Sequence, residues 1–239
     1  MNQSRATAAS QTSDRQNERA LKAALLNVLR DQQMIDKSSC IANEFYLPSF
    51  SYRADLAILS KIFIGIEIKS ELDSLRRLQE QTDGYLQYFD MVIVVLAEKH
   101  LAKAKELSLR DANILAVGPN GKITMVQCPK SQSLKRRPFW ELMTQTEKRV
   151  FDRTINLISP TNLAAREALE REAFYAAFQA RFTETSRAFW SATNRRKIAA
   201  QDLQLLSRYH ELRESQAKWN ADRAVASEQW LIKAQRCFA

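Results

Sequence analysis

Glycine, proline, cysteine and histidine are all scarce in this chain. Among its 239 residues there are only 4 Gly, 5 Pro, 3 Cys and 2 His. So little glycine and proline excludes collagen-like and low-complexity proteins. Cys40, Cys128 and Cys237 are far apart and odd in number. They argue against a disulfide scaffold or a zinc site and favour a reducing, cytoplasmic setting. With only His100 and His210, a histidine-rich metal site is excluded too.

Long hydrophobic runs are also missing. No segment approaches the ~20 uncharged apolar residues that a membrane-spanning helix needs. The polar N-terminus, Met1 to Asn17, lacks the apolar stretch of a secretory signal peptide. We therefore expect a cytoplasmic protein without a membrane partner. The hydrophobic fraction of 45% is nevertheless ample for a packed core.

The positive charge is concentrated in the C-terminal part of the chain. The net charge is +9, and residues 135–239 hold 19 Lys+Arg against 12 Asp+Glu, whereas residues 1–134 hold 17 against 15. An excess of basic charge favours a polyanionic partner, although charge alone is a weak argument.

The chain up to residue 130 alternates between helical and strand patterns. Residues 1–12 are small and polar, which is typical of a disordered tail. Ser13 or Asp14 can cap a helix with apolar residues at Leu21, Leu25, Val28 and Leu29. Strands are expected at 41–47, 53–59, 62–69, 91–96, 113–117 and 122–127, and further helices at 71–89 and 98–109. This order predicts an α/β domain over residues 13–130.

No strand pattern follows residue 130. Residues 131–138 are polar and basic and are typical of a linker. Residues 139–239 form a helical, basic region, with helices expected at 140–158, 163–182, 186–206 and 215–237. The stretch 159–162 predicts a break followed by a helix cap. Phe174, Tyr175, Phe178 and Phe182 recur at helical spacing and are expected in the core.

Charged side chains interrupt the apolar hairpin over residues 53–69. Glu67 and Lys69 are two residues apart and so project from the same face of their strand. A two-residue turn would pair Asp55 with Ile66, whereas one extra turn residue or a bulge at Gly65 would pair it with Glu67. Gly65 is expected to leave this face open to a ligand.

Two neighbouring carboxylates both ionise readily only if a cation lies between them. Such oxygen ligands suit Mg²⁺ or Mn²⁺, and a lysine beside them can orient a water for attack on a phosphodiester. The alternative is an edge strand with alternating exposed charges, because a Glu-x-Lys triplet also arises by chance in a chain that is 26% charged.

The pattern around the hairpin resembles the PD-(D/E)XK nuclease superfamily. Within it the sequence is most similar to the small bacterial family of sce-type proteins. The matching residues, within about residues 40–100, are Asn43-Glu44, Arg53-Ala54-Asp55, Glu67-Ile68-Lys69-Ser70, Asp73, Arg77-Leu78, Gln81 and Tyr85. Ala54 stands where the superfamily name has Pro. The resemblance implies a restriction-endonuclease-like mixed sheet core of order αβββαβ, here with a C-terminal all-helical extension.

The resemblance also implies roles for individual residues. Asp55, Glu67 and the backbone carbonyl of Ile68 would hold Mg²⁺ or Mn²⁺, and Lys69 would be the catalytic lysine. Glu44 matches an upstream acidic position that contributes to the metal site, through water if not directly. Gln81 and Tyr85 are similar to the QxxxY motif of RecB-like nucleases, which steadies the active site and touches DNA.

The helix expected after the hairpin adds active-site support. Arg77, Gln81 and Tyr85 are four residues apart and form one stripe, which is also common on ordinary helix surfaces. Asp73 can orient Arg77 through an ion pair. His100 has no Ser or Cys nucleophile motif nearby, so we expect no direct role for it.

Several basic residues are candidates for nucleic-acid binding. They are Arg53, Lys135, Arg136, Arg137, Arg195, Arg196 and Lys197. Basic clusters near aromatic residues suit phosphate contact, but basic triplets are more often simply solvated surface.

The sequence thus predicts a Mg²⁺-dependent DNA nuclease, with RNA as a second substrate class and a homodimer or larger complex left open. Two alternatives are a non-catalytic nucleic-acid-binding protein that keeps the fold and a subunit of a defence or mobile-element system that is active only with its partner. Phage defence and DNA repair are both compatible settings.

Overall fold

The computed structural model describes residues 18–48, 52–109, 111–129, 139–158, 160 and 162–207. The chain divides into two compact units, Met1–Leu206 and Ser207–Ala239. Of the second unit only Ser207 is described. The expected tail (1–12), the caps Ser13 and Asp14, and the expected linker (131–138) lie outside the described residues.

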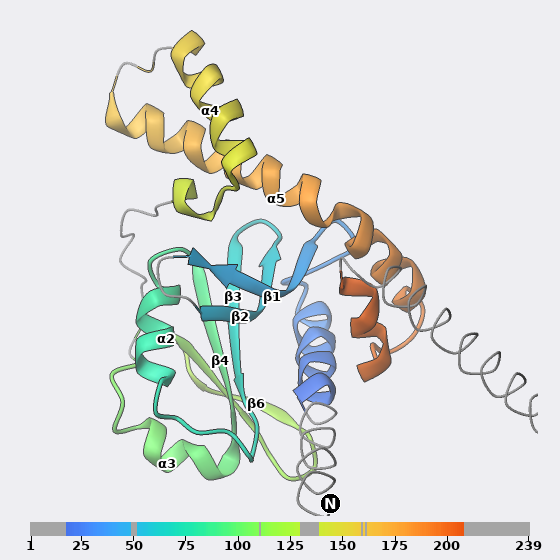
Figure 1. Cartoon of the computed structure of the whole chain (residues 1–239). Helices are drawn as coiled ribbons and strands as arrows, with labels where there is room; N and C mark the ends of the chain where they lie inside the picture. The colour runs from blue at the N-terminus through green and yellow to red at the C-terminus, as the bar shows by residue number, and fades with distance from the viewer. Residues whose placement is uncertain are drawn as a thin grey trace, which may run out of the picture. The chain divides into compact units, whose positions relative to one another are not determined.

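Six strands form one mixed sheet in the order β1-β2-β3-β4-β5-β6 (Figure 1). They are β1 (Cys40–Leu47), β2 (Tyr52–Leu59), β3 (Phe63–Lys69), β4 (Met91–Ala97), β5 (Asn113–Val117) and β6 (Ile123–Gln127). Neighbouring strands are antiparallel except for the parallel pairs β3–β4 and β4–β5. Each expected strand is present, with its ends shifted by at most one residue.

The turn between β2 and β3 decides how the predicted site residues meet. Leu59 pairs with Phe63, so the turn has three residues, 60–62. Leu56 consequently pairs with Ile66, and the next step of the same register places Asp55 opposite Glu67. Of the two registers expected, the one with an extra turn residue is therefore the one adopted, without a bulge at Gly65.

The helical elements differ more from expectation than the strands do. They are the N-terminal helix (18–31), α2 (Leu78–Tyr85), η2 (Glu98–His100), α3 (Leu101–Ala104), η3 (Phe139–Leu142), α4 (Gln145–Ile158), α5 (Leu163–Thr193) and η4 (Ala200–Leu206). Asn162 caps α5, because its side-chain oxygen accepts a hydrogen bond from the Ala165 amide at 2.9 Å.

Most expected helices have different bounds: the one at 140–158 is divided into η3 and α4, and the one at 186–206 is divided between the end of α5 and η4. Residues 71–77 are not helical, because the Asp73 carboxylate binds the Ser70 amide and holds a turn instead. The helix expected at 98–109 tightens into turns after Ala104, where Leu107 donates its amide to the Ala104 carbonyl. Conversely, α5 continues through the gap expected at 183–185, since no glycine or proline interrupts it.

The helical segment after residue 138 packs on the sheet rather than standing apart from it. Phe178 of α5 lies 5.5 Å from Phe45 of β1 and 5.2 Å from Phe63 of β3, measured between ring centroids. Phe174 and Phe178 are fully buried, and Phe182 nearly so, as the sequence predicted. Figure 1 shows α5, in orange, passing close to β1. The compact unit therefore runs across the expected boundary at 131–138 and ends at Leu206.

Two hydrophobic cores cover the two faces of the sheet. One core contains α2, the segment after α3, η3, α4 and most of α5. The other contains the N-terminal helix, the end of α5 and η4. The fold is thus α/β, with the αβββαβ order and the helical C-terminal region that the sequence predicted. Within the described part of the chain, no helix is both long and apolar enough to span a bilayer.

Candidate functional site

Asp55 and Glu67 meet at one end of the β2–β3 pair. The register places them opposite each other, and the Ile68 amide of β3 donates a hydrogen bond to Asp55 Oδ2 at 2.6 Å. This bond ties the carboxylate of one strand to the backbone of the next. The hairpin therefore brings together the two acidic residues predicted as metal ligands.

Glu67 is a buried carboxylate with a partner on each oxygen. It is only 3% exposed. Lys69 Nζ lies 2.6 Å from Oε1, which confirms that both side chains project from one face of β3. The Tyr85 hydroxyl lies 2.5 Å from Oε2 and 2.8 Å from the Arg53 carbonyl oxygen. Helix α2 thus holds Tyr85 against Glu67 and against the backbone of β2.

The electrostatics of the pair are those of two like charges in a buried place. Burial and the negative charge of Glu67 raise the pKa of the Asp55 carboxyl well above its ordinary value. The nearby Lys22 ammonium and the Ile68 amide oppose this only in part. Burial and the charge of Glu67 also raise the pKa of the Tyr85 hydroxyl, which therefore stays protonated. The pair carries more negative charge than its surroundings compensate.

Sequence reasoning missed Lys22, which lies beside Asp55. Lys22 is only 2% exposed and comes from the N-terminal helix. Its Nζ lies 2.7 Å from Glu18 Oε1, 2.6 Å from Glu44 Oε1 and 3.8 Å from Asp55 Oδ1. Burial favours the neutral amine, but the charges of Asp55, Glu44 and Glu18 outweigh it and raise the pKa of Lys22. The chain thus supplies a buried cation at this site.

The sequence does contain a signal for Lys22. Lys22 precedes Leu25, Leu26 and Leu29 by three, four and seven residues, so it occupies an apolar position of the helix stripe. Leu25, Leu26 and Leu29 are buried in the core, as this stripe requires. A lysine on the buried face of a helix needs carboxylate partners, which could have pointed to Glu44 and Asp55.

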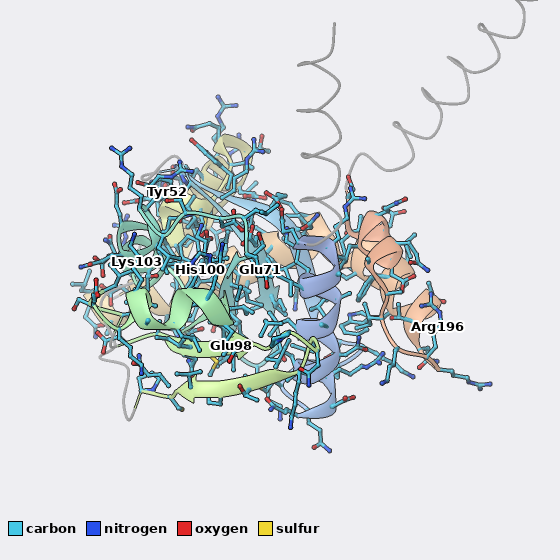
Figure 2. The ribbon with its side chains drawn as sticks, turned by 90° about the horizontal axis from the view of Figure 1, so that it is seen from below. Tyr52, Glu71, Glu98, His100, Lys103 and Arg196 are labelled. Atoms are coloured by element: carbon cyan, nitrogen blue, oxygen red, sulfur yellow. The ribbon has the colours of Figure 1, made fainter. Side chains whose placement is uncertain are left out.

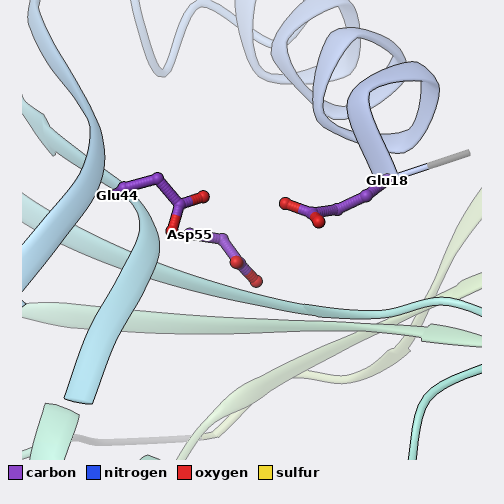
Figure 3. Close-up of side chains that lie close together, drawn as sticks. All are labelled: Glu18, Glu44 and Asp55. Carbon is purple, nitrogen blue, oxygen red and sulfur yellow. The ribbon is translucent and has the colours of Figure 1, made fainter. Parts of the chain in front are cut away.

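Glu18, Glu44 and Asp55 converge on one space between the N-terminal helix and the strands (Figure 3). One carboxylate oxygen from each lies within 4.8 Å of the others. Glu44 is exposed and has a left-handed backbone, with φ of 58°. Before Glu44 the even-numbered residues Cys40 and Ala42 of β1 face the first core. After it the odd-numbered residues Phe45 and Leu47 do. The kink brings Glu44 close to Lys22 while keeping both flanks of β1 packed.

The predicted support residues do not all reach the site. Tyr85 does, but Arg77 is exposed at the start of α2, so the expected stripe is buried only at Gln81 and Tyr85. Gln81 is 7% exposed, and no hydrogen-bond partner satisfies its buried Oε1 among the described residues. Asp73 binds the Ser70 amide and hydroxyl at 2.7 and 2.6 Å, rather than serving mainly to orient Arg77.

His100 has a structural contact at this end of the sheet. Its Nε2 lies 2.9 Å from the Ser70 carbonyl oxygen, and the ring is buried. This links η2 to the end of β3, immediately after Lys69. The contact fits the expectation that His100 has no direct chemical role.

The space above Gly65 is filled, which corrects one prediction. A Cβ at Gly65 would lie 2.3 Å from the Phe89 ring. Gly65 is therefore required by close packing of Phe89 against β3, and it does not leave the face open to a ligand.

The basic candidates fall in different places. Lys135, Arg136 and Arg137 lie outside the described residues. Arg53 is exposed on β2, beside Asp55 in sequence. Arg195, Arg196 and Lys197 are exposed just after α5, and Arg196 makes two 2.7 Å hydrogen bonds to Asp202. Figure 2 shows Arg196 on the other side of the N-terminal helix from His100, Glu98 and Lys103 in that view.

The basic triplet lies near the far end of the N-terminal helix. Arg30 NH2 donates to the Arg196 carbonyl oxygen at 3.1 Å. Arg30 is eight residues beyond Lys22 on the same helix, which is about 12 Å at 1.5 Å per residue. The triplet and the acidic site are thus at opposite ends of one helix.

Comparison with known proteins places the chain in a family. A family model described as bacteriophage P4 protein cII matches residues 11–207. The chain belongs to the bacteriophage P4 protein cII family. The match ends within one residue of the compact unit, at Leu206, so this family includes both the sheet and the helical segment packed on it.

The individual relatives cover less. Protein cII of Enterobacteria phage P4 is 32% identical over 103 residues, which are 43% of this cII-family chain and 39% of that protein. More than half of that relative is therefore unmatched. Among solved structures, a protein of unknown function from Silicibacter pomeroyi is 19% identical, with a TM-score of 0.38, over 62% of this chain and 95% of that one. Likeness at this level assigns no function.

Proposed function

We propose that this cII-family chain is a metal-dependent nuclease of the PD-(D/E)XK type, which hydrolyses DNA phosphodiester bonds. One observation carries the proposal: Asp55 accepts a 2.6 Å hydrogen bond from the Ile68 amide, next to Glu67, and Lys69 Nζ lies 2.6 Å from Glu67. Placing the partly buried Asp55 close to the buried Glu67 costs free energy, because two like charges are held together with little water to screen them. A divalent cation is the simplest requirement that explains both acids.

The residues present fit a hard divalent cation. Asp55 and Glu67 supply carboxylate oxygens, and the pKa of Asp55 is raised by burial and by the charge of Glu67, both of which a bound cation would counteract. In this proposal Asp55, Glu67 and the Ile68 carbonyl hold Mg²⁺ or Mn²⁺, and Glu44 contributes through water. When bound, such an ion would lower the pKa of a coordinated water and polarise a phosphoryl oxygen.

The chain's own residues then have distinct tasks. Lys69 orients the attacking water and stabilises the negative charge that develops on the phosphate. The Ile68 amide and the Tyr85 hydroxyl hold Asp55 and Glu67, respectively, in fixed positions. Such supporting hydrogen bonds set the orientation of metal ligands.

The substrate would be held by exposed basic side chains, one next to the acidic site and others farther from it. Arg53 lies next to the site, while Arg195 and Lys197 are exposed at the far end of the N-terminal helix. We propose that these residues contact phosphates of DNA, with RNA as the second substrate class. A cytoplasmic location and a homodimer or larger complex complete the proposal.

The test is cleavage of single- and double-stranded DNA and of RNA, with Mg²⁺ or Mn²⁺. We expect Asp55→Ala and Lys69→Ala to abolish cleavage, whereas Asp83→Ala, which removes an exposed acid from α2, leaves it unchanged. Cleavage that persists in both site variants would reject the proposed site.

A second candidate, a non-catalytic nucleic-acid-binding protein, is favoured by one specific observation. The Lys22 ammonium already lies among the carboxylates of Glu18, Glu44 and Asp55. If Lys22 supplied all the positive charge that the site needs, the fold would not require a metal. This candidate predicts salt-sensitive DNA binding that is indifferent to Mg²⁺ and proceeds without turnover.

A further inference from the structure

The Lys22 ammonium has a complete set of acceptors. Its Nζ lies 2.7 Å from Glu18 Oε1, 3.1 Å from Asn43 Oδ1 and 2.6 Å from Glu44 Oε1. An ammonium has three N–H donors, and these three oxygens match them one to one. Asp55 Oδ1, at 3.8 Å, is beyond hydrogen-bond distance and feels Lys22 through charge alone.

Asp55 therefore lies between two unlike neighbours. On one side is the fixed cation Lys22; on the other is the carboxylate of Glu67, opposite it in the β2–β3 register. In enzymes with two metal ions, one carboxylate commonly stands between the two ions. Here the chain itself places a positive charge on one side of Asp55.

We propose that Lys22 is a built-in cation that takes the place of a second divalent ion, so that the site binds one ion only. This inference rests on the proposed function, because it assumes that an ion binds between Asp55 and Glu67. Lys22 is a positioning residue: it holds Glu44 and offsets part of the negative charge of Glu18, Glu44 and Asp55 without touching the substrate.

Burial makes this arrangement permanent. Lys22 is 2% exposed, and its helix is anchored through Leu25, Leu26 and Leu29 in the second core. The ammonium is thus held in place by its three acceptors and by the close packing around it. A mobile surface lysine could yield its place to Mg²⁺, but this one cannot.

The experiment counts bound Mn²⁺ per full-length chain, by equilibrium dialysis with electron paramagnetic resonance detection of free Mn²⁺. We expect one ion for the wild type and two for Lys22→Met, which keeps an unbranched chain one atom shorter than that of lysine and removes the charge. Lys22→Arg, which keeps the charge, and Lys103→Met, which removes a lysine from the surface of α3, should each bind one.

Different results separate the two proposals. Two ions in the wild type, or one ion bound equally by the wild type and by folded Lys22→Met, would overturn the role of Lys22 and leave the metal site standing. No ion in the wild type would overturn the proposed nuclease itself. If Lys22→Met does not fold, Lys22→Gln, which also removes the charge but keeps a polar group, takes its place: two bound ions support the role of Lys22, and one overturns it.

Discussion

The charges on the two sides of Asp55 are handled in opposite ways. On the Lys22 side, one buried ammonium binds two carboxylates, those of Glu18 and Glu44, that are themselves partly exposed to water. On the Glu67 side, the carboxylate is buried, and its partners are Lys69 and the neutral hydroxyl of Tyr85. The first side keeps an excess negative charge on side chains that water can screen, whereas on the second side Asp55 and Glu67 share the ammonium of Lys69 with far less water around them. That difference locates the metal in the proposal.

The largest loss of cleavage should come from a change on the Glu67 side, where the carboxylate is buried. Glu67→Gln removes the charge of the buried carboxylate while keeping its shape. Removing a residue that only supports a metal ligand typically lowers activity about 10–100-fold, so losing a proposed ligand itself should lower cleavage at least about a hundredfold. Glu18→Gln, on the Lys22 side, should lower the rate only a few-fold. Single-turnover assays with Mg²⁺ measure both; equal losses would mean that the two sides do the same work.

Removing Lys22 should cost more stability than removing an exposed cation. Lys22→Met leaves Glu18, Glu44 and Asp55 facing one another and removes hydrogen bonds to charged groups, so we expect a loss of about 1.5–3 kcal/mol of stability. Arg196→Met removes a half-exposed partner of Asp202, so it should lower the stability clearly less than Lys22→Met does. Urea denaturation without divalent ions compares them. Similar costs would show that Lys22 is no more than an ordinary ion pair.

Tyr85 should matter on the Glu67 side alone. Loss of a hydrogen bond that orients a metal ligand typically weakens metal binding about 10–100-fold, so we expect this for Mn²⁺ binding by Tyr85→Phe. Tyr88 is a matched control, because its hydroxyl lies 2.5 Å from a different carboxylate, that of Glu141. Tyr88→Phe should leave Mn²⁺ binding unchanged. If both variants bind as tightly as the wild type, Tyr85 is only a packing residue.

The smallest effects belong to the exposed basic residues. Arg195→Ala and Lys197→Ala should change stability by no more than about 0.5 kcal/mol. If each side chain binds one DNA phosphate, its removal should make the dependence of log affinity on log salt shallower by about 0.9. Fluorescence anisotropy with a labelled DNA over a salt series measures this. An unchanged slope would remove the triplet from the DNA-binding surface.

The strands and the meeting of Asp55 with Glu67 were predictable, whereas much of the rest of the site was not. Alternation and turn chemistry located every strand, and only two registers were open for the hairpin. Lys22 was not predicted, because the search for helical periodicity looked for apolar residues and ignored a polar residue at one position of the stripe. The prediction that Gly65 leaves its face open to a ligand was wrong, because the sequence does not show that Phe89 packs against it. Likewise, Asp73 holds a turn before α2 through its own side chain and so delays the start of the expected helix, which propensity alone does not reveal.

The most direct test of the metal site is the melting temperature of the wild type and of Asp55→Asn across pH, with and without Mn²⁺. The folded-state pKa of Asp55 lies well above its ordinary value of 3.8. The stability from its protonated form is therefore complete below about pH 3.8 and is lost as the pH rises through the raised pKa. Without Mn²⁺, the melting temperature of the wild type should fall relative to that of Asp55→Asn as the pH rises from about 3.8 through the raised pKa of Asp55. Added Mn²⁺ should raise the melting temperature of the wild type at neutral pH and not that of Asp55→Asn. An equal rise in both proteins would contradict a metal site at Asp55.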